Sequence, residues 1–293
     1  MVTVSPTPEP ATLRRVIELA GRAPSVENSQ PWRWRRTAAG LELHVDGRRR
    51  LPGRDPSGRN AVISCGAALH HVQVAAAALG WGTEVDRVPD RSGASLLARI
   101  ELHPAPPPGH AEADLRAIAE RCTDRRRFTS WPVPAEPLHR LAHIASAHGT
   151  EAAPLLGVTE RFRAELLVSR AGESEGTEVS DGLIVLSGAS DDAAAWLSAG
   201  EGLSALWLAA TDEGLSVVPL SEVVDVPETR RALQHEVLAG RSHPLLLVRI
   251  GWQEISRSQL PRTERRPVED VLDCGETCEP CEPASRRHAA PAG

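Results

Sequence analysis

A short run of small polar residues between a helix and a strand is the stretch of this sequence best suited to binding a ligand. It reads Ala23-Pro24-Ser25-Val26-Glu27-Asn28-Ser29-Gln30-Pro31-Trp32. Pro24, Ser25 and Asn28 disfavour continuation of the preceding helix, and the tryptophans that follow are typical of a strand. The turn therefore offers hydroxyl, amide and backbone N–H groups to a small molecule. The alternative is an ordinary helix-to-strand connection.

A second polar segment combines arginines with a hydroxyl. At the end of a helix predicted over 111–122, the sequence reads Arg121-Cys122-Thr123-Asp124-Arg125-Arg126-Arg127-Phe128. A guanidinium presents planar, paired donors to a phosphate, and a hydroxyl adds one more donor. Arg121, Thr123 and Arg125 are therefore candidate phosphate ligands. The two arginines that follow are expected to be solvated or paired with acids, and an exposed basic patch is the alternative for the segment.

These two segments resemble the flavin-dependent nitroreductase family. The first matches the family's A-P-S-x-x-N-x-Q-P-W segment, which lies against the FMN ring. The second is similar to the R-x-S-x-R segment that binds the FMN phosphate, with threonine in place of serine. The resemblance extends from about residue 10 to residue 272. It implies FMN contacts from Pro24, Ser25, Val26, Asn28, Gln30, Arg121, Thr123 and Arg125.

Two further segments complete the FMN site that the resemblance implies. The stretch similar to the family's segment along the flavin ring reads Gly214-Leu215-Ser216-Val217-Val218-Pro219-Leu220-Ser221. Its last three residues are the expected ring contacts, and a plain helix–loop–strand is the alternative. In relatives a basic pair near the C-terminal end reaches the phosphate, which points to Arg265 and Arg266. Because FMN itself carries the electron chemistry, no catalytic side chain is predicted.

Composition narrows the function classes. The 293 residues are 41% hydrophobic and carry a formal net charge of −6, which gives no basic footprint for nucleic acid. No run of 18 apolar residues predicts a membrane span, and no signal-peptide pattern is visible. Five cysteines in a chain of this length do not indicate a disulfide scaffold. We therefore expect a cytoplasmic protein without a nucleic-acid or membrane partner.

Cysteine and histidine patterns give weaker alternatives. Cys274, Cys278 and Cys281 have the spacing of a radical S-adenosylmethionine cluster. They fall in a tail rich in Gly, Glu and Pro, and no chain remains to build the barrel that such a cluster needs. A soft-metal or redox role stays open for them, and disorder is the default. His139 and His143 share a helix face but lack an evident third ligand, so no metal site is predicted.

Hydrophobic periodicity predicts an alternation of helices and strands. Helices are expected over 10–22, 64–79, 111–122, 135–147, 160–170 and 192–213, and from Pro227 to near Gly240. Strands are expected from Pro31 and over 41–45, 95–102, 183–186, 215–218 and 245–250. Gly80 and Gly214 stand where helix-capping glycines belong, and the prolines of 104–108 mark a linker.

The two halves of the chain resemble each other. Residues 134 positions apart match between two small-residue helices: Ser64, Gly66, Leu69, Ala75, Ala76 and Gly80 meet Ser198, Gly200, Leu203, Ala209, Ala210 and Gly214. Residues 150 positions apart match between two strands: Arg91, Ser92, Leu96, Leu97, Arg99 and Ile100 meet Arg241, Ser242, Leu246, Leu247, Arg249 and Ile250. The strand match is the stronger, because burial does not demand identical arginines and serines.

Ordinary flavin nitroreductases are homodimers whose FMN sites lie between the subunits. The chain resembles the branch of the family in which one fused chain mimics the dimer, namely actinobacterial proteins associated with dormancy and stress. This implies an α+β fold of nitroreductase type with two related halves, 1–108 and 109–272, and a disordered tail over 273–293. One FMN site per chain and a monomer are expected.

The function implied is an FMN-dependent NAD(P)H oxidoreductase that reduces nitro compounds, quinones or a similar small acceptor. The alternative is an FMN-sequestering or storage protein with little turnover. Dormancy-type relatives carry a longer segment in place of 171–182, associated with a lid over the flavin, and the shorter segment here favours the reductase. A degenerate family member without flavin is the third possibility, against which the candidate site residues speak.

Overall fold

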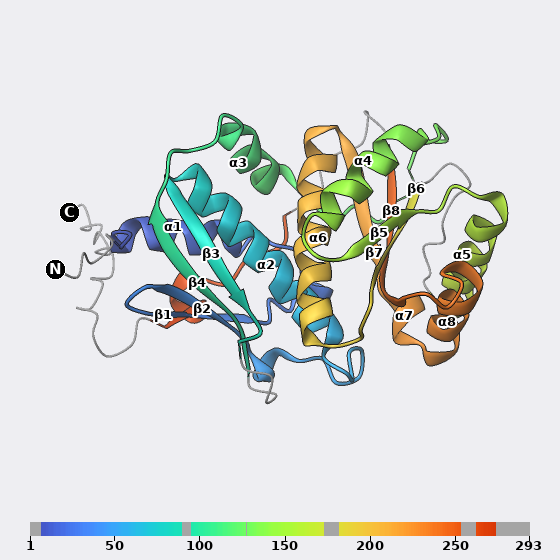
Figure 1. Ribbon diagram of the computed structural model, residues 1–293, viewed down its shortest axis with the longest axis horizontal. Helices are drawn as coiled ribbons and strands as arrows, with labels where there is room; N and C mark the ends of the chain where they lie inside the picture. The colour runs from blue at the N-terminus through green and yellow to red at the C-terminus, as the bar shows by residue number, and fades with distance from the viewer. Residues whose placement is uncertain (1–6, 90–94, 127, 173–181, 253–261, 274–293) are drawn as a thin grey trace, which may run out of the picture.

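The computed structural model describes residues 7–89, 95–126, 128–172, 182–252 and 262–273. Two β-sheets stand at opposite ends of the molecule, and two long helices, α2 (Arg59–Ala78) and α6 (Ala193–Asp212), lie side by side between them (Figure 1). Further helices cover the sheets. The α+β architecture expected from the sequence is confirmed.

The first sheet has the strand order β3-β4-β2-β1-β9. Its strands are β1 (Trp32–Arg36), β2 (Gly40–Val45), β3 (Trp81–Arg87), β4 (Leu96–Pro104) and β9 (Leu272–Asp273). Neighbouring strands are antiparallel except β1 and β9, which run parallel. α1 (Pro10–Ala20), α2 and α3 (Ala111–Glu120) pack with this sheet around Trp32, Trp34 and Leu69.

The second sheet is antiparallel, with the order β5-β6-β8-β7. Its strands are β5 (Glu151–Pro154), β6 (Gly182–Gly188), β7 (Leu215–Leu220) and β8 (His243–Trp252). α4 (Ala135–Ser146) and α6 pack on one face; α5 (Val158–Ala171), α7 (Glu222–Asp225) and α8 (Pro227–Ala232) pack on the other. Because both faces are covered, β6 is buried along its whole length, which explains its continuous apolar run.

The two sheets share one succession of strands. The order β3-β4-β2-β1 in the first sheet corresponds to the order β7-β8-β6-β5 in the second. The helix before β3 is α2 and the helix before β7 is α6, and both helices end in the same way. Gly80 after α2 and Gly214 after α6 both have left-handed φ, at +87° and +75°, as the predicted capping role requires. The internal sequence repeat therefore has a counterpart in topology.

α2 and α6 approach each other through a pair of glycines. A Cβ added to Gly66 would overlap the carbonyl oxygen of Leu197 and lie 2.9 Å from Cα of Gly200. A Cβ added to Gly200 would overlap the carbonyl oxygen of Ile63 and lie 2.8 Å from Cα of Gly66. The contact is reciprocal, as at a two-fold interface, and its partners are the residues matched by the sequence repeat.

A buried polar cluster lies further along the same helix pair. His70 Nδ1 is 2.9 Å from Ser204 Oγ, and its ring meets that of His148 edge-on, with centroids 4.8 Å apart. Glu201 is fully buried and accepts hydrogen bonds of 2.7 and 2.8 Å from the Arg87 guanidinium. Burial lowers the pKa of His70 to about 3, and the nearby His148 lowers it further. Both imidazoles are therefore held neutral at physiological pH.

α2 is long and apolar enough to cross a membrane by length and composition, with a mean hydropathy of 1.4 over its best 18 residues. In this fold 78% of that window is buried, because α2 packs against the first sheet on one side and α6 on the other. Its apolar character is that of a core helix.

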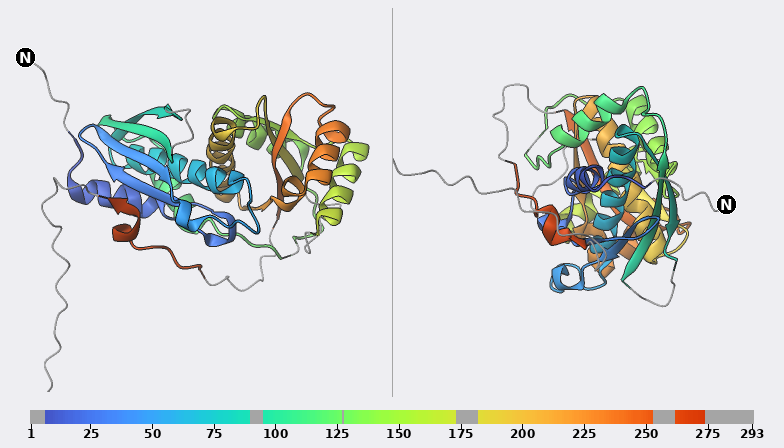
Figure 2. Two further views of the ribbon diagram at one scale, coloured as in Figure 1. Left: turned by 90° about the horizontal axis from the view of Figure 1, so that it is seen from below. Right: turned by 90° about the vertical axis from the view of Figure 1, so that its left-hand side faces the viewer.

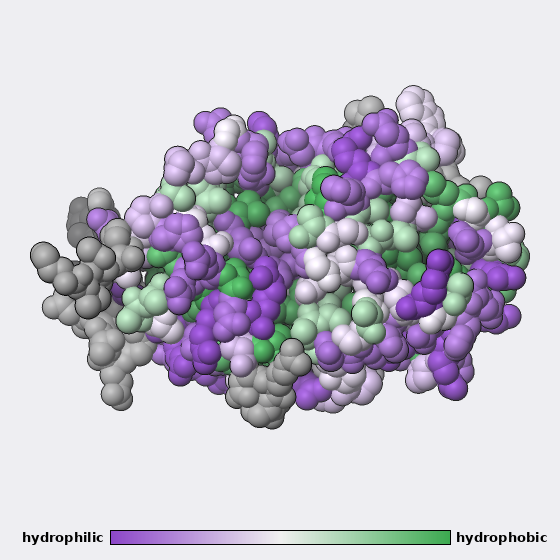
Figure 3. All heavy atoms as spheres, in the orientation of Figure 1, coloured by the Kyte–Doolittle hydropathy of each residue, from purple (hydrophilic) through white to green (hydrophobic). Residues whose placement is uncertain are grey.

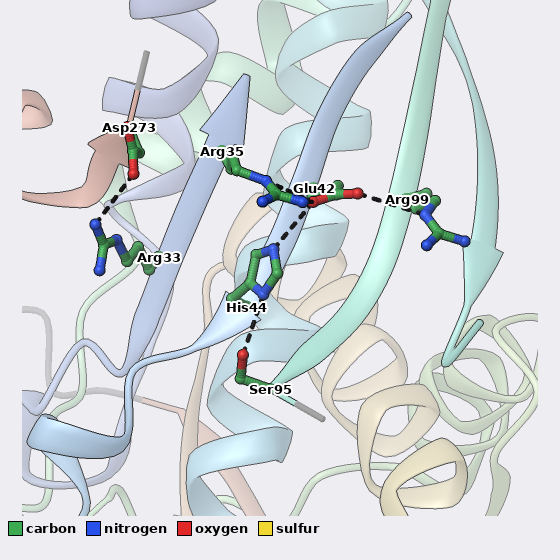
Figure 4. Close-up of polar contacts among 7 residues, drawn as sticks. All are labelled: Arg33, Arg35, Glu42, His44, Ser95, Arg99 and Asp273. Atoms are coloured by element: carbon green, nitrogen blue, oxygen red, sulfur yellow. Dashed lines mark hydrogen bonds and ion pairs between the residues drawn. The ribbon is translucent and has the colours of Figure 1, made fainter. Parts of the chain in front are cut away.

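The outer face of the first sheet is polar. Glu42 accepts hydrogen bonds from His44 and Arg35 and forms an ion pair with Arg99 (Figure 4). Although burial raises its pKa, these contacts bring a net lowering. Figure 3 shows polar residues over most of one face of the molecule, with apolar groups toward the end that carries α5, where Phe162 is exposed. The outer face of the first sheet is therefore suited to contact with solvent.

Residues 262–273 pack with the first sheet, although β8 belongs to the second (Figure 2). They contain α9 (Val268–Val271) and β9, in which Leu272 pairs with Trp34. The second half expected from the sequence, 109–272, thus contributes α3, α9 and β9 to the first core. The three cysteines of the expected tail lie outside the described residues.

Each predicted helix and strand has a counterpart, but some elements were not predicted. β3 and β5 are edge strands of mixed composition that depend on pairing with their neighbours, and α7 and α9 are single turns. α2 begins five residues before the predicted start, because the Asp55 side chain accepts the Ala61 N–H at 2.8 Å. The helix from Pro227 continues as a π-helical turn, Leu233–Val237.

The glycine contact predicts that Gly200→Ala destabilises the fold. The added methyl group meets backbone atoms rather than a movable side chain, so we expect a loss of about 1–3 kcal/mol, as for overpacked cores. Gly53→Ala is the control, because nothing lies within 4 Å of a Cβ at that exposed position. Thermal unfolding of the two variants checks this, and equal melting temperatures would contradict the close approach.

The buried histidines predict a loss of stability in acid. Since the pKa of His70 is about 3 in the fold and about 6.5 in an unfolded chain, the unfolded state binds the extra proton between these values. The free energy of unfolding therefore falls as pH drops below about 6.5, by about 1.4 kcal/mol per pH unit for this group. Urea unfolding from pH 7 to 4.5 should show a shallower fall in His70→Asn but not in the exposed His139→Asn.

Candidate functional site

Two adjoining cavities lie where the two halves of the chain meet. The larger, of about 910 Å³, is lined by the end of α1, residues 24–28, residues 121–125 and residues 262–271, and is called the cationic cavity below. The smaller, of about 430 Å³, lies between α2, α6 and the end of β7 and is called the apolar cavity. Both volumes are in the usual range for ligand sites. Their shared wall consists of Pro24, Ser25, Glu27, Thr123 and Arg125.

The loop after α1 is tightly wound. Glu27, Asn28 and Gln30 have left-handed φ values of 47°, 53° and 47°, which is rare for residues other than glycine and is frequent at functional sites. The Gln30 N–H donates to Ser25 Oγ at 3.0 Å, and the Val26 N–H donates to Ser64 Oγ of α2 at 3.2 Å. These bonds fix the loop against α2, with Pro24, Ser25 and Val26 facing the cavities.

The same loop holds the C-terminal segment in place. The Asn28 side-chain amide donates to the Glu264 carbonyl at 3.0 Å and accepts from Arg265 Nη1 at 3.0 Å. The Arg266 N–H donates to Gln30 Oε1 at 2.9 Å. Gln30 therefore lines neither cavity; it lies behind the wall and positions Arg266. This contact carries Arg265 and Arg266 to the cationic cavity from the far end of the chain.

Arg121 is a buried cation whose guanidinium is only partly hydrogen-bonded. Its Nη2 donates to the Arg22 carbonyl at 2.8 Å, and its guanidinium lies 4.7 Å from the centre of the Trp207 ring. Nε and Nη1 are buried and have no partner among the described residues. Burial, with a smaller effect from the charge of Arg265, lowers the pKa of Arg121 to about 9. Unpaired buried donors are costly, so the residues present fit an anionic group such as a phosphate.

The segment that follows Arg121 is fixed from the second sheet. Arg249 of β8 is buried, donates to the Arg125 carbonyl at 3.2 Å and lies over the Phe128 ring at 4.5 Å. Arg126 pairs with the buried Asp124, as expected for an arginine without a ligand role. Thr123 and Arg125 remain exposed at the junction of the two cavities. A hydroxyl and a guanidinium are thus presented together.

The apolar cavity has walls from both sequence halves. Its hydrophobic surface comes from Ile63, Ala67, Leu203, Trp207, Leu220 and Leu246. Polar groups stand at one end, where Asp225 accepts from Asn60 at 2.9 Å and pairs with the buried Arg59. Burial raises the pKa of Asp225, against the effect of Arg59. Such a space suits a flat aromatic ligand with a few polar edges.

Apart from Gln30, the predicted site residues line one or both cavities. Pro24, Ser25, Thr123 and Arg125 line both; Asn28, Arg121, Arg265 and Arg266 line the cationic cavity; Val26, Pro219, Leu220 and Ser221 line the apolar cavity. Sequence reasoning did not assign Ser64 or Trp207 to the site, although Ser64 is one of the residues matched by the internal repeat. It also missed Arg22, which follows α1 and lines the cationic cavity. Within the described residues, no group of His, Cys, Asp or Glu is arranged to hold a metal.

Comparison with curated proteins decides the family. A Mycobacterium tuberculosis (strain ATCC 25618 / H37Rv) protein named "Putative NAD(P)H nitroreductase" is 34% identical over 317 aligned positions, covering 91% of this chain and 92% of the relative. This chain belongs to the nitroreductase family. A second such relative from the same strain, named "Putative NAD(P)H nitroreductase acg", is 31% identical over 89% of this chain and 95% of its own length. No protein-family model matches the chain.

Comparison with solved structures also finds nitroreductases. A nitroreductase with bound FMN from Bacteroides fragilis is 16% identical, with a TM-score of 0.42, over 52% of this chain and 94% of its own. A nitroreductase-like family protein from Bacillus cereus is also 16% identical, with a TM-score of 0.42, over 56% and 96%.

The contact between the loop after α1 and the C-terminal segment predicts the effect of Gln30→Ala. The Arg266 N–H loses its acceptor, which is worth about 0.5–1.5 kcal/mol. We expect the Arg266 amide to exchange hydrogen roughly two- to tenfold faster, while amides of β6 are unchanged. Gln234→Ala, in the π-helical turn beside α8, is the control. Unchanged exchange at Arg266 would mean that Gln30 does not hold this segment.

Proposed function

We propose that this chain is an FMN-dependent NAD(P)H oxidoreductase that reduces nitro compounds, quinones or a similar small acceptor. One observation carries the proposal: Arg121 is buried with two unpartnered nitrogens, and its guanidinium lies over Trp207, a wall of the apolar cavity. A ligand with a phosphate at one end and an aromatic ring at the other satisfies both features. Membership of a family whose members are named as NAD(P)H nitroreductases supports the same assignment.

The chain's own residues would divide the binding of FMN between them. Arg121, Thr123 and Arg125 would hold the phosphate at the junction of the cavities, with Arg265 and Arg266 beside them. The ring would lie in the apolar cavity against Pro24, Ser25, Val26, Pro219, Leu220 and Ser221, with Asn28 on the side of the cationic cavity. Bound FMN supplies the hydride and electron chemistry. The protein would orient it and exclude water on the α2–α6 side.

We also infer that the chain mimics a dimer, with halves near 1–108 and 109–272, one FMN and no need for a second copy. The reciprocal glycine contact and the shared strand order support this. By the repeat, Ala67 and Trp207 of the apolar cavity correspond to Glu201 and Gln73, which are hydrogen-bonded to each other at 2.8 Å. The equivalent second cavity is therefore filled. We also propose that the chain belongs to the dormancy-associated branch of the family and that it is located in the cytoplasm.

The decisive experiment is an anaerobic titration of the FMN-loaded protein with NADPH and with NADH, following the visible flavin band. Prompt bleaching would support a reductase and lead to acceptor screening. A band that persists in a protein that retains FMN would favour sequestration, the alternative function. A purified protein that binds no FMN would overturn both.

Removal of Arg125 should weaken FMN retention. Arg125→Ala deletes one charge-assisted contact, worth about 1.5–3 kcal/mol; because Arg125 is exposed, we expect the lower end, or about a tenfold rise in Kd. Equilibrium dialysis or flavin fluorescence measures this. Arg116→Ala is the control, since Arg116 is an exposed arginine of α3 that lines neither cavity. Equal affinity in both variants would place the phosphate elsewhere.

A further inference from the structure

The cationic cavity holds more positive charge than one phosphate can neutralise. Six of its arginines form no ion pair with a carboxylate in the part of the chain that the structure describes: Arg22, Arg121, Arg125, Arg262, Arg265 and Arg266. Its glutamates are already engaged, in the ion pairs Glu18–Arg15, Glu27–Arg54 and Glu269–Arg14. The concentration is local, because the whole chain carries a net charge of −6.

The positive charge of the cationic cavity exceeds what the FMN phosphate can neutralise, which indicates that a second anion binds there. A phosphate monoester carries about −1.5 to −2 at neutral pH, so FMN would leave about four of these positive charges unmatched. The arginines of this cavity repel one another. Burial lowers the pKa of Arg265, and the charges of Arg22 and Arg262 lower it further. Like charges held together in this way destabilise the protein unless an anion sits among them.

Arg125 alone among these arginines lines both cavities; the others line only the cationic cavity. Arg125 lies at the junction with the apolar cavity, where the FMN phosphate is proposed to bind. Arg22 and Arg262 line only the cationic cavity, whose volume of about 910 Å³ is more than twice that of the apolar cavity at about 430 Å³. Arg22 follows the last turn of α1, and Arg262 donates to the Ala119 carbonyl at the end of α3. Both are thus tied to helices.

We propose that Arg22 and Arg262, which lie beside Arg265 of the proposed FMN-phosphate site, form a subsite for a second phosphoryl group, carried by the nicotinamide dinucleotide that reduces the flavin. The inference rests on the proposed function and adds to it the residues that bind the reductant. Two parts of a dinucleotide offer the required chemistry, the pyrophosphate of any such molecule and the 2′-phosphate of NADPH. Guanidinium groups bind either one through paired donors.

The test uses calorimetric titration of the FMN-loaded protein with non-reducing fragments: 2′,5′-ADP, ADP and 5′-AMP. A subsite for the 2′-phosphate gives tighter binding of 2′,5′-ADP than of ADP, whereas a subsite for the pyrophosphate gives the reverse order. In either case Arg22→Gln should raise the Kd of the preferred fragment about tenfold, as expected for one charge-assisted contact. Arg116→Gln removes the same charge outside the cavity and should leave the Kd unchanged.

Three outcomes would overturn the subsite. The first is equal Kd values for all three fragments, and the second is an equal loss in Arg22→Gln and Arg116→Gln, which would reflect net charge alone. The third is loss of FMN from Arg22→Gln, which would assign Arg22 to the cofactor phosphate. These results are distinct from failure of the proposed function, which would appear as a wild-type protein that binds no FMN.

Discussion

The backbone contact between α2 and α6 is the constraint on which the rest of the structure depends. Two glycines face each other at the crossing, and neither position has room for a methyl group. The helices can therefore approach closely enough to bring both sheets into one body. The same approach places Ala67 of α2 and Trp207 of α6 in the wall of one cavity. A single pair of small residues thus determines where a ligand can lie.

The buried charges on the two sides of the α2–α6 crossing differ in whether the protein itself supplies their partners. On one side, Glu201 is buried with Arg87 and Gln73 as partners, so the charge is satisfied within the protein. On the other side, Arg121 is buried, and within the described residues its guanidinium is hydrogen-bonded to one carbonyl and lies over an aromatic ring. A satisfied cluster is a structural element, whereas an unsatisfied one needs a ligand. The asymmetry explains how a chain with two similar halves has one cavity suited to a cofactor.

Local sequence signals accounted for the helices and for the candidate ligand residues, but not for how distant segments meet. The glycine caps at Gly80 and Gly214 were predictable, because the left-handed conformation favours one residue type. The edge strands β3 and β5 were not, because their formation depends on partners elsewhere in the chain. For the same reason, the sequence did not indicate that Gln30 accepts the Arg266 N–H. Contacts of this kind leave no local pattern in the sequence.

The position of residues 262–273 has a consequence for how the protein folds during its synthesis on the ribosome. Domains fold from the N-terminus as they emerge, yet β1 receives its outer neighbour, β9, only from the end of the described chain. Until then the first sheet presents an open edge. Arg265 and Arg266 also come late in the chain, after β1 to β8. The part of the cationic cavity lined by residues 262–271 is thus completed late in synthesis, and a polypeptide released after β8 would lack both this part and β9.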